Sequence, residues 1–441
     1  MSFSMLILGG GPAGLAAGYY ARKCGWDFSL LEAGGEIGGN CRTLRLGDFR
    51  FDTGAHRLHD KDPEVTGEIK QLLGEDLLEV DAPSEIFSGG KFFRFPLSPS
   101  NLARQLSGST LLRIALENMR PKQSRQPGNF EQFAKDQYGP TLAGRFLLNY
   151  SAKLWGEEPS NLSIEVSGGR LKQLNLGSVV RDALYRGKRK SRHLDGSFLY
   201  PRYGIGVIPD RMGEFIGADC IRLNNRVTGF NTTQGRIESV VVNGNVEIAA
   251  RRFVNTLPLT LTVKMLASAA PREILDAAES IKYRHLVLCV FCLDRPSFSP
   301  NASLYFPDAE FPFTRLYEPK QRSAFMAPVG QTAIVLEMPC YGEDAVWDSP
   351  DEVLQQLAWS ALLQVKQMSA DEVVRFEVVR IPFAYPVLEV GFEARVQALV
   401  DYLGTFENLH MTGRSSLFRY LHVHDLFRAG KELIEEIAQV T

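Results

Sequence analysis

The sequence predicts an α/β fold, in which a Rossmann-like domain with a parallel sheet is joined to a second α+β domain with a helical insertion. Three observations predict it. An apolar strand at residues 5–8 runs directly into a glycine-rich turn and a helix, and a second apolar strand at residues 28–31 ends at Glu32. Short alternating strands return after Gly204. Strand, helix and strand in this order are typical of a parallel sheet.

The first glycine-rich turn, residues 9–14, predicts a dinucleotide site. Gly9, Gly11 and Gly14 have the G-x-G-x-x-G spacing. Gly9 permits a tight turn, Gly11 lets a pyrophosphate approach the backbone, and Gly14 lets the helix pack closely on the sheet. The helix N-terminus then faces the phosphates, and Glu32 can accept both ribose hydroxyls. The alternative is an ordinary turn, because glycines alone are not specific. Further contacts are expected from Pro12, Ala13 and Ala33.

A second glycine-rich stretch, residues 33–44, indicates FAD rather than NAD. FAD is buried along its whole length, so it needs more backbone and a cation over its pyrophosphate. Gly38 and Gly39 provide close backbone approach, and Arg42 provides a bidentate phosphate donor, unless it is a solvated surface arginine. A strand and turn at residues 49–59 follow. Flavin contacts are expected there and just before it from Asn40, Gly54, Ala55 and His56.

This succession of motifs resembles the flavoprotein superfamily that contains monoamine oxidase, protoporphyrinogen oxidase and UDP-galactopyranose mutase. The resemblance implies an FAD domain of the glutathione-reductase type. The cysteine of covalent flavin enzymes is missing from the C-terminal region, so the FAD should be non-covalent.

Four segments of the middle of the chain are predicted from periodicity. Residues 63–74 have a helical pattern, and residues 85–97 read as strand, turn and strand. Residues 98–120 form an apolar and basic helical stretch that either packs on its own domain or docks peripherally on a membrane, as a similar region can in protoporphyrinogen oxidases. The basic run at residues 186–193 is expected to be a solvated loop or, alternatively, to meet an anionic substrate.

Two further segments resemble family motifs. Residues 145–163 resemble the Y-x-x-K-x-W-G-x-x-P stretch, which implies that Tyr150, Lys153 and Trp155 lie near flavin or substrate, although Trp155 can equally be a core residue. Residues 408–420 resemble the distal FAD motif, and the family implies that the residues beside the ribityl-pyrophosphate or the flavin ring are Gly413 and Arg414.

The second half of the chain is expected to complete the FAD domain. Alternating strands after Gly204 resemble the three-stranded meander of such domains, with Val227 and Thr256 near the cofactor. Residues 286–293 predict a buried strand. A closing helix at residues 425–440 is expected to direct its N-terminus at the flavin pyrimidine.

Composition is that of an enzyme with a large core. The chain has 441 residues, enough for two or three domains, and a net charge of −2 gives no general attraction to nucleic acid. The N-terminus lacks a secretory signal, and the apolar runs are too short to span a bilayer, so we expect a cytoplasmic protein with at most peripheral membrane contact. Six cysteines suggest reduced thiols. Cys289 and Cys292 would point to opposite faces of a strand, so no metal site is expected.

The domains are expected to be discontinuous. Residues 1–60, 200–259 and 401–441 would form the FAD domain, with helices on one face of a parallel sheet and the meander on the other. Residues 61–199 and 260–400 would form the substrate domain, a mixed sheet with a helical cover. The active site would lie between them, over the flavin ring.

Other segments of the sequence carry the resemblance to UDP-galactopyranose mutase. Residues 312–322 resemble the segment whose arginine binds a nucleotide diphosphate, which implies Arg315 as a phosphate clamp with Glu318 beside it. Tyr385 resembles a substrate-strand tyrosine of the mutase. The structural alternatives are that Arg315 pairs with Glu318 or Asp308 at the surface, and that Tyr385 packs in the core.

The sequence departs both from the pattern of the monoamine-type oxidases and from that of the mutase. Monoamine-type oxidases carry a lysine on a central strand, and residues 285–294 have none. Their paired aromatics are only partly matched by Phe418 and Tyr420. The mutase has an acidic residue two positions after the tyrosine that matches Tyr420, where this chain has His422.

Two functions follow, with flavin binding without turnover as a third. The first is an FAD-dependent oxidoreductase of the amine oxidase or desaturase type, which takes a hydride from a small molecule onto flavin N5 and passes electrons to oxygen or an external acceptor. His56, Lys153 and Tyr420 would position the substrate or relay protons. The alternative is a non-redox sugar-nucleotide isomerase that uses reduced FAD. The arginines suggest an acidic or nucleotide-linked substrate, and oligomeric state stays open. The catalytic candidates are His56, Lys153, Arg315, Tyr385 and Tyr420.

Overall fold

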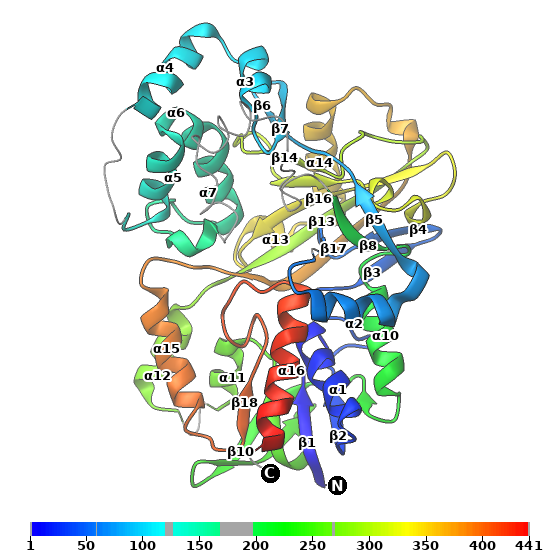
Figure 1. Cartoon of the computed structure of the whole chain (residues 1–441), viewed down its shortest axis with the longest axis vertical. Coiled ribbons are helices and arrows are strands. Elements are labelled where there is room, and N and C mark those ends of the chain that lie inside the picture. Colours follow the sequence, from blue (N-terminus) through cyan, green and yellow to red (C-terminus); the bar gives the residue numbers. More distant parts are fainter. Residues whose placement is uncertain (1, 59, 120–126, 168–196, 267–269, 440–441) are drawn as a thin grey trace.

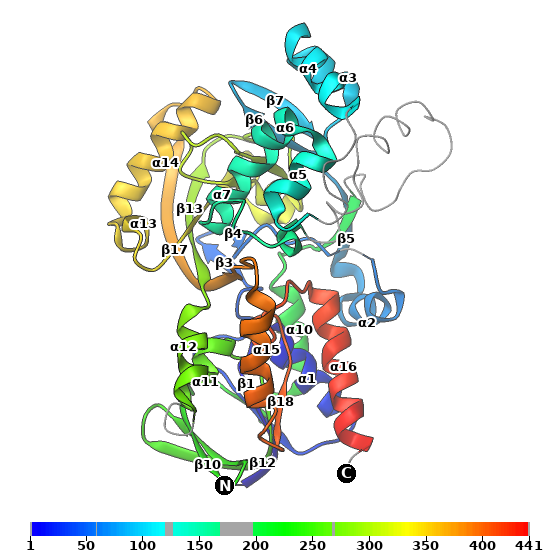
Figure 2. The same ribbon diagram turned by 90° about the vertical axis from the view of Figure 1, so that its left-hand side faces the viewer.

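Two seven-stranded sheets organise the chain. The structure is a computed structural model and describes residues 2–58, 60–119, 127–167, 197–266 and 270–439. The first sheet and both ends of the described chain lie in the lower lobe of Figure 1, and the second sheet lies in the upper lobe. Figure 2 shows the same two lobes from the side. This division confirms the predicted α/β fold class.

The first sheet has the strand order β10-β11-β12-β1-β2-β9, with β18 also paired to β12. All pairings among β1, β2, β9, β12 and β18 are parallel, whereas β10, β11 and β12 form an antiparallel meander. The meander therefore shares β12 with the parallel sheet. The strands are β1 (Ser2–Leu8), β2 (Phe28–Leu31), β9 (Ile221–Arg222), β10 (Val227–Thr233), β11 (Arg236–Val242), β12 (Val246–Asn255) and β18 (Leu409–Met411).

Each face of this sheet is covered by helices. Met5 and Ile7 face one helical layer and Leu6 and Leu8 face the other, because side chains alternate along β1. The first layer is α1 (Pro12–Lys23), α2 (Pro63–Leu73), α10 (Val207–Ile216) and α16 (Val423–Gln439). The second layer packs beside the meander and is α11 (Leu259–Met265), α12 (Arg272–Ser280) and α15 (Phe392–Leu403). Most of the residues of these last three helices fall in the range 260–400, which was expected to belong to the substrate domain.

The second sheet is mixed, with the order β17-β13-β16-β15-β14-β6-β7. Only its β14–β6 pairing is parallel. Its strands are β6 (Ser84–Ser88), β7 (Lys91–Phe95), β13 (Tyr283–Leu293), β14 (Ser303–Tyr305), β15 (Arg315–Tyr317), β16 (Thr332–Cys340) and β17 (Val373–Pro386). There are also two antiparallel two-stranded sheets: the hairpin of β3 (Thr43–Leu46) with β4 (Phe49–Asp52), and the pair of β5 (Leu77–Asp81) with the distant β8 (Ser197–Pro201).

The helical cover of the second sheet comes from two parts of the chain. The N-terminal part is α3 (Pro99–Gln105), α4 (Gly108–Met119), α5 (Phe130–Tyr138), α6 (Pro140–Leu142) and α7 (Asn149–Trp155), and the later part is α13 (Ala345–Asp348) and α14 (Asp351–Val365). The stretch predicted as helical at 98–120 is two helices, because α3 ends before Ser107. No helix of the described residues is long and apolar enough to cross a membrane. The basic run 186–193 lies outside the described residues.

The central strand β13 is buried as predicted. Cys289 packs with Val287 in one core cluster, and Cys292 packs on the opposite face with Phe49. All six cysteines are free thiols. Within the described ranges, no group of three or more His, Cys, Asp or Glu side chains could hold a metal ion.

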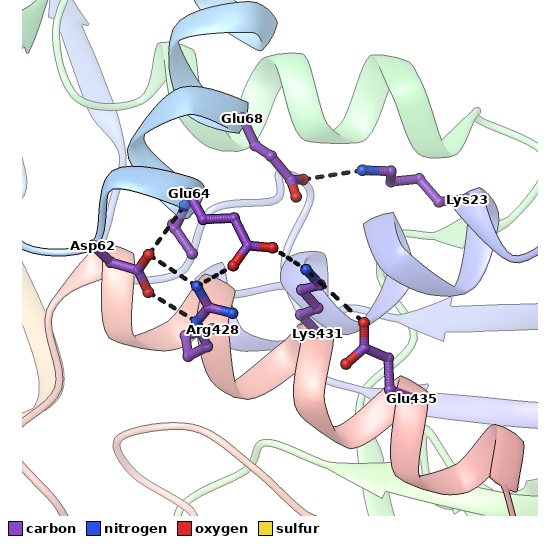
Figure 3. A network of polar contacts seen from close by, with 8 residues as sticks. Lys23, Asp62, Glu64, Glu68, Arg428, Lys431 and Glu435 are labelled. Atoms are coloured by element: carbon purple, nitrogen blue, oxygen red, sulfur yellow. Dashed lines mark hydrogen bonds and ion pairs between the residues drawn. The ribbon is translucent and has the colours of Figure 1, made fainter.

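A surface network fixes α2 to the C-terminal helix α16 (Figure 3). Asp62 accepts hydrogen bonds from Val65 N (3.2 Å) and from Arg428 Nε and Nη2 (2.8 and 2.9 Å). Glu64 accepts from Arg428 Nη2 (2.7 Å) and from Lys431 Nζ. Isolated surface pairs contribute little, but several charges held in one network contribute more. The chain that leaves the His56 turn is therefore anchored at α2.

Candidate functional site

The first glycine turn closes tightly under β12. Gly9 has φ +105°, and a Cβ on it would lie 2.5 Å from Thr256 Oγ1. A Cβ on Gly14 would lie 1.9 Å from the Gly9 carbonyl oxygen, so the helix can approach the strand only with glycine there. Gly11 is the N-cap of α1, and no described side chain caps this helix. The backbone N–H groups of the first turn of α1 are thus available to an anion.

The second glycine loop lies against the first. Gly38 N donates to the Gly10 carbonyl (2.8 Å), and Gly39, with φ +51°, would place a Cβ 3.0 Å from Gly11 Cα. Arg42 Nε donates to the Gly39 carbonyl (3.0 Å), and its Nη1 lies 3.7 Å from Glu36. The Gly11 and Gly39 turns therefore form a backbone cradle without side chains, and Arg42 holds its rim.

Glu32 joins these two turns at the end of β2. Its Oε2 accepts from Gly10 N (2.8 Å) and its Oε1 from Gly34 N (2.7 Å). Each carboxylate oxygen keeps a further lone pair for a ribose hydroxyl. The Glu32 carbonyl, just before Ala33, accepts from Asn225 N (2.8 Å), which brings the start of β10 at Val227 beside this end of the sheet.

The distal motif closes the same site from the C-terminal side. Gly413 has φ +100°, and a Cβ there would lie 2.7 Å from Ala13 Cβ and 3.8 Å from Thr256 Cβ. β18 pairs with β12 just before it, and Thr256 Oγ1 donates to the Leu8 carbonyl (2.7 Å). Three distant segments, around Gly9, Thr256 and Gly413, therefore meet at the carboxyl edge of the parallel sheet, where open α/β sheets bind nucleotides.

The turn after β4 leads from this cradle to the second sheet. Thr53 Oγ1 donates to the Asn40 carbonyl (2.9 Å), and Ala55 N donates to Glu337 Oε1 (3.1 Å). Gly54 lies between them, and His56 follows. Because one end of the turn is tied to the glycine loop and the other to β16, His56 is placed between the two lobes.

Arg315 forms a bidentate pair with Glu337, its cross-strand partner on β16. Arg315 Nε donates to Glu337 Oε2 (2.7 Å) and Nη2 to Oε1 (2.8 Å). Burial opposes the arginine charge, but Glu337 outweighs it and holds the pKa of Arg315 well above its usual value. Both surface partners expected for Arg315 are wrong. Glu318 accepts from Phe298 N (3.0 Å) on the other side of the strand, and Asp308 accepts from backbone and serine donors in β6 and its turn.

Arg414 lies between two aromatic rings. Its guanidinium carbon is 5.1 Å from the centroid of the Tyr385 ring and 4.4 Å from that of Tyr420. Arg414 Nε and Nη2 are buried and have no hydrogen-bond partner among the described residues. Burial raises the pKa of Tyr385 above its usual value. Trp155 is buried, and its ring contacts that of Tyr385 edge-on at 6.1 Å.

Lys153 is not brought to this group. Its Nζ donates to the carbonyls of Phe306, Asp308 and Phe313 (2.8, 2.9 and 3.0 Å). Three acceptors use all three donors of an ammonium group. Burial lowers the pKa of Lys153 to about 8. The side chain therefore holds the loop before β15.

His56 stands in a field of positive charge. Burial, and after it the charges of Arg322, Arg315 and Arg414 in that order, together lower its pKa to about 3. Its Nδ1 is buried and has no partner among the described residues. His56 is therefore a neutral imidazole with a free ring nitrogen at physiological pH.

Sequence reasoning missed two members of the site. Glu337 is the one carboxylate inside the buried apolar strand β16, and that isolation was a usable signal. Arg322 is 2% exposed and stacks on Tyr317 at 4.7 Å, with Nε and Nη1 lacking partners among the described residues. Nothing in its surroundings in the sequence distinguishes it from a surface arginine.

These features fit FAD. The cradle that a Cβ would fill suits a pyrophosphate, Glu32 suits a ribose, and the orphaned donors of Arg414 with Nδ1 of His56 face the region beyond the cradle. Gly11, Gly39 and Glu32 would hold the nucleotide half, with the flavin toward His56.

Comparison with known proteins agrees with this geometry. The family model of the flavin-containing amine oxidoreductases matches residues 12–432. The chain is 23% identical over 317 residues to chloroplastic protoporphyrinogen oxidase 1 of Spinacia oleracea, covering 64% of this chain and 54% of the relative. It is 29% identical over 162 residues to coproporphyrinogen III oxidase of Mycobacterium leprae (strain TN), covering 33% and 36%. The chain thus spans about half the length, or less, of these curated relatives.

Solved structures show the same fold over the whole chain. A crystal structure of reduced UDP-galactopyranose mutase has a TM-score of 0.87 at 18% identity, covering 100% of this chain and 96% of that one. A putative protoporphyrinogen oxidase from Exiguobacterium sp. 255-15 has a TM-score of 0.79 at 20% identity, covering 99% of both chains. Putrescine oxidase bound to putrescine has a TM-score of 0.68 at 16% identity, covering 100% and 99%. Together with the family match, these likenesses confirm the predicted resemblance and the FAD cofactor.

Proposed function

This chain belongs to the family of flavin-containing amine oxidoreductases, and we propose that it oxidises a small, negatively charged molecule by hydride transfer. Bound FAD supplies the hydride acceptor at N5. The protein then has to bind the substrate, orient it over the ring and control charge and protons around it.

One observation carries the proposal: arginines from two distant parts of the chain, Arg315 and Arg322 near β15 and Arg414 after β18, lie around a neutral histidine. Arg322, Arg315 and Arg414 all act on His56. Fixed positive charge in a site shielded from water stabilises negative charge strongly. Bound FAD would gain negative charge on reduction, and an acidic substrate would add its own, so the positive charge of these arginines would favour both.

Each side chain then has a distinct task. Arg414, with two free donors, binds an acidic group of the substrate, and the rings of Tyr385 and Tyr420 hold its guanidinium in place. His56 Nδ1 accepts a hydrogen bond from the substrate, because a neutral imidazole whose pKa is lowered to about 3 is an acceptor and only a weak base. Arg315 acts through Glu337, because that carboxylate occupies Nε and Nη2 and also fixes the His56 turn at Ala55 N.

The charge of the site distinguishes between the cationic and the acidic compounds that appear in the names of the similar proteins. One structural neighbour was solved with putrescine, a diamine that is cationic at neutral pH. Glu337 neutralises Arg315, but a cation would still meet Arg322 and Arg414 and be repelled. The curated relatives are named for protoporphyrinogen and coproporphyrinogen III. We propose that this chain accepts an acidic compound of that kind rather than a diamine.

Anaerobic reduction of the holoenzyme tests the proposal. The visible flavin band is followed while protoporphyrinogen, coproporphyrinogen III or putrescine is added without oxygen. We expect an acidic compound to bleach the band and putrescine to leave it unchanged. R414Q should slow bleaching at low substrate concentration, whereas the matched variant of its exposed neighbour, R419Q, should not. Bleaching by putrescine alone, or equal rates in both variants, would refute the proposal.

The isomerase alternative has one observation in its favour, the free donors of Arg414, which could equally receive a diphosphate. Against it, Arg315, its expected clamp, is already neutralised by Glu337. Incubating photoreduced enzyme with UDP-galactopyranose decides between them. Conversion of the sugar with the flavin still reduced would favour the isomerase. If the oxidoreductase proposal holds, admitting air to the reduced enzyme tells whether oxygen is the acceptor, because the flavin band then returns quickly.

A further inference from the structure

Tyr283 connects the two halves of the molecule beneath the site. It begins β13, a strand of the second sheet, yet its ring packs in the core cluster of the first sheet, beside Phe418. It is 7% exposed, and its hydroxyl donates to the Ser415 carbonyl (3.0 Å). Ser415 follows Arg414 directly, so Tyr283 touches the backbone that carries this arginine.

Two phenylalanines in a strained conformation pack on Tyr283. Phe383 has φ +52° and Phe418 has φ +51°, in the left-handed region that side chains other than glycine rarely adopt. Their rings meet that of Tyr283 edge-on, with centroids 5.3 and 5.2 Å away and interplanar angles of 75° and 84°. Such strain persists only where the surroundings hold it, and Tyr283 is the contact that the two share.

The strain at Phe383 belongs to a bulge in β17. Pairing with β13 is regular from Cys292↔Arg375 to Leu286↔Ile381 and resumes at Arg284↔Tyr385, so residues 382–384 lie opposite a single residue of β13. Phe383 N donates to Nδ1 of that residue, His285 (3.1 Å). A bulge redirects the side chains that follow it, and Tyr385 comes two positions later.

Phe418 stands in the same relation to Tyr420. The two strained residues thus precede, by two positions each, the two tyrosines whose rings lie 5.1 and 4.4 Å from the Arg414 guanidinium. We propose that Tyr283 is a positioning residue, which sets the geometry of Tyr385, Arg414 and Tyr420 by supporting the backbone at Phe383 and Phe418. The inference rests on the proposed function in that it takes this trio as the place where an acidic group binds.

The test uses the holoenzyme and benzoate, an aromatic carboxylate, as the probe. Binding is measured as the perturbation of the visible flavin band on titration. Tyr283→Leu removes both ring contacts and the support that they give to the backbone at Phe383 and Phe418. We expect this loss to weaken benzoate binding by about tenfold or more. Tyr283→Phe keeps both rings and loses only the hydroxyl, so it should restore binding to within about threefold of wild type.

Phe291→Leu is the matched control for buried aromatic volume. Phe291 lies on the same strand, is fully buried, and contacts Phe376 (4.7 Å) and Trp359 (5.6 Å) in the core on the outer side of the second sheet. We expect F291L to lower the melting temperature as much as Y283L does and to leave benzoate affinity unchanged. Equal benzoate affinity in Y283L and F291L would overturn the proposal.

R414Q separates this inference from the proposed function. If R414Q binds benzoate like wild type, the trio is not the anion site and the proposed function fails. If R414Q loses binding and Y283L does not, only the positioning inference fails.

A crystal structure of the Y283L holoenzyme would show directly, without benzoate, where the rings of Tyr385 and Tyr420 lie relative to Arg414. We expect one or both tyrosine rings to move away from Arg414, and rings that stay at the wild-type distances would overturn the inference. If Y283L does not fold, Phe418→Leu serves in its place, because it removes one of the two contacts with Tyr283. It should displace Tyr420 and leave Tyr385 where it is, and an undisturbed Tyr420 would count against the role of Tyr283.

Discussion

Replacing Gly39 by alanine should impair FAD binding far more than it impairs folding. A Cβ at this position would lie 3.0 Å from Gly11 Cα, closer than ordinary van der Waals contact. The two glycine turns that form the cradle would have to separate by a few tenths of an ångström. Gly11 is the N-cap of α1, so this shift moves the N–H groups that face the pyrophosphate.

The size of the effect follows from the bonds at stake. Losing one hydrogen bond to a charged phosphate costs about 1.5–3 kcal/mol, which corresponds to roughly a 10- to 150-fold rise in the FAD dissociation constant. The φ of +51° adds a separate cost of about 1–2 kcal/mol for a residue with a Cβ. That second cost is paid with or without FAD, so it lowers the stability of the apoprotein and not the affinity.

Gly244→Ala separates the two costs. Gly244 has φ +81° in the turn between β11 and β12, and an added Cβ would meet no described atom within 4 Å. Titration of each apoprotein with FAD, followed by quenching of flavin fluorescence, gives the dissociation constants, and urea unfolding gives the apoprotein stabilities. We expect similar losses of stability and a loss of affinity only in Gly39→Ala. Equal dissociation constants for the two variants would refute the assignment of the cradle.

Three further predictions follow from the charges. Because the pKa of His56 is lowered to about 3, flavin reduction should show no ionisation of His56 between about pH 5 and pH 8, and a step near pH 6.5 that vanishes in His56→Gln would contradict this. Arg428 lowers the pKa of Asp62 to about 2, so the pair stabilises the fold above the usual value of 3.8 and loses its effect as pH falls toward about 2. Arg428→Gln should therefore lower the urea midpoint at neutral pH but hardly at about pH 2, and an equal loss at both would be inconsistent with the pair. Glu337→Gln leaves the Arg315 charge without its carboxylate and should cost about 3–5 kcal/mol in urea unfolding, which a loss below about 1 kcal/mol would disprove.

The geometry of the N-terminal glycine turns, which we assign to FAD, could be predicted because its determinants are contiguous. Gly9, Gly11, Gly14 and Glu32 fall within a single strand–helix–strand unit, and each has a local backbone reason to be where it is. The helix expected at residues 63–74 likewise agrees with α2, since turn residues and apolar periodicity mark it.

Packing partners were harder to predict than elements. An amphipathic helix shows which of its faces is buried but not which sheet covers it. The place of α11, α12 and α15 in the chain therefore suggested the second sheet, whereas all three pack on the first. The break between α3 and α4 was missed because an apolar stretch with helical periodicity continues across it.

The partner of Arg315 shows more clearly why contacts between distant residues could not be predicted from the sequence. Glu318 and Asp308 were the expected partners from the surrounding sequence, but neighbouring strands bring Glu337 directly opposite. Strand alternation excludes Glu318, since residues three apart on a strand point to opposite faces. Only the register of β15 with β16 identifies the true partner, and register is a long-range property.

The same reasoning explains why the substrate class could be inferred only with the structure. Read one by one, Arg315, Arg322 and Arg414 are ordinary arginines in a chain whose net charge is −2. Two come from the region of β15 and the third from the turn after β18, and they converge on His56, which follows β4. Net charge describes the solvated surface, whereas the local field of a buried site is set by the few charges that folding brings together. A chain that is slightly acidic overall thus forms a locally positive site, because Arg322 and Arg414 add their charges to the neutral Arg315–Glu337 pair. This local sign favours an acidic substrate over a diamine.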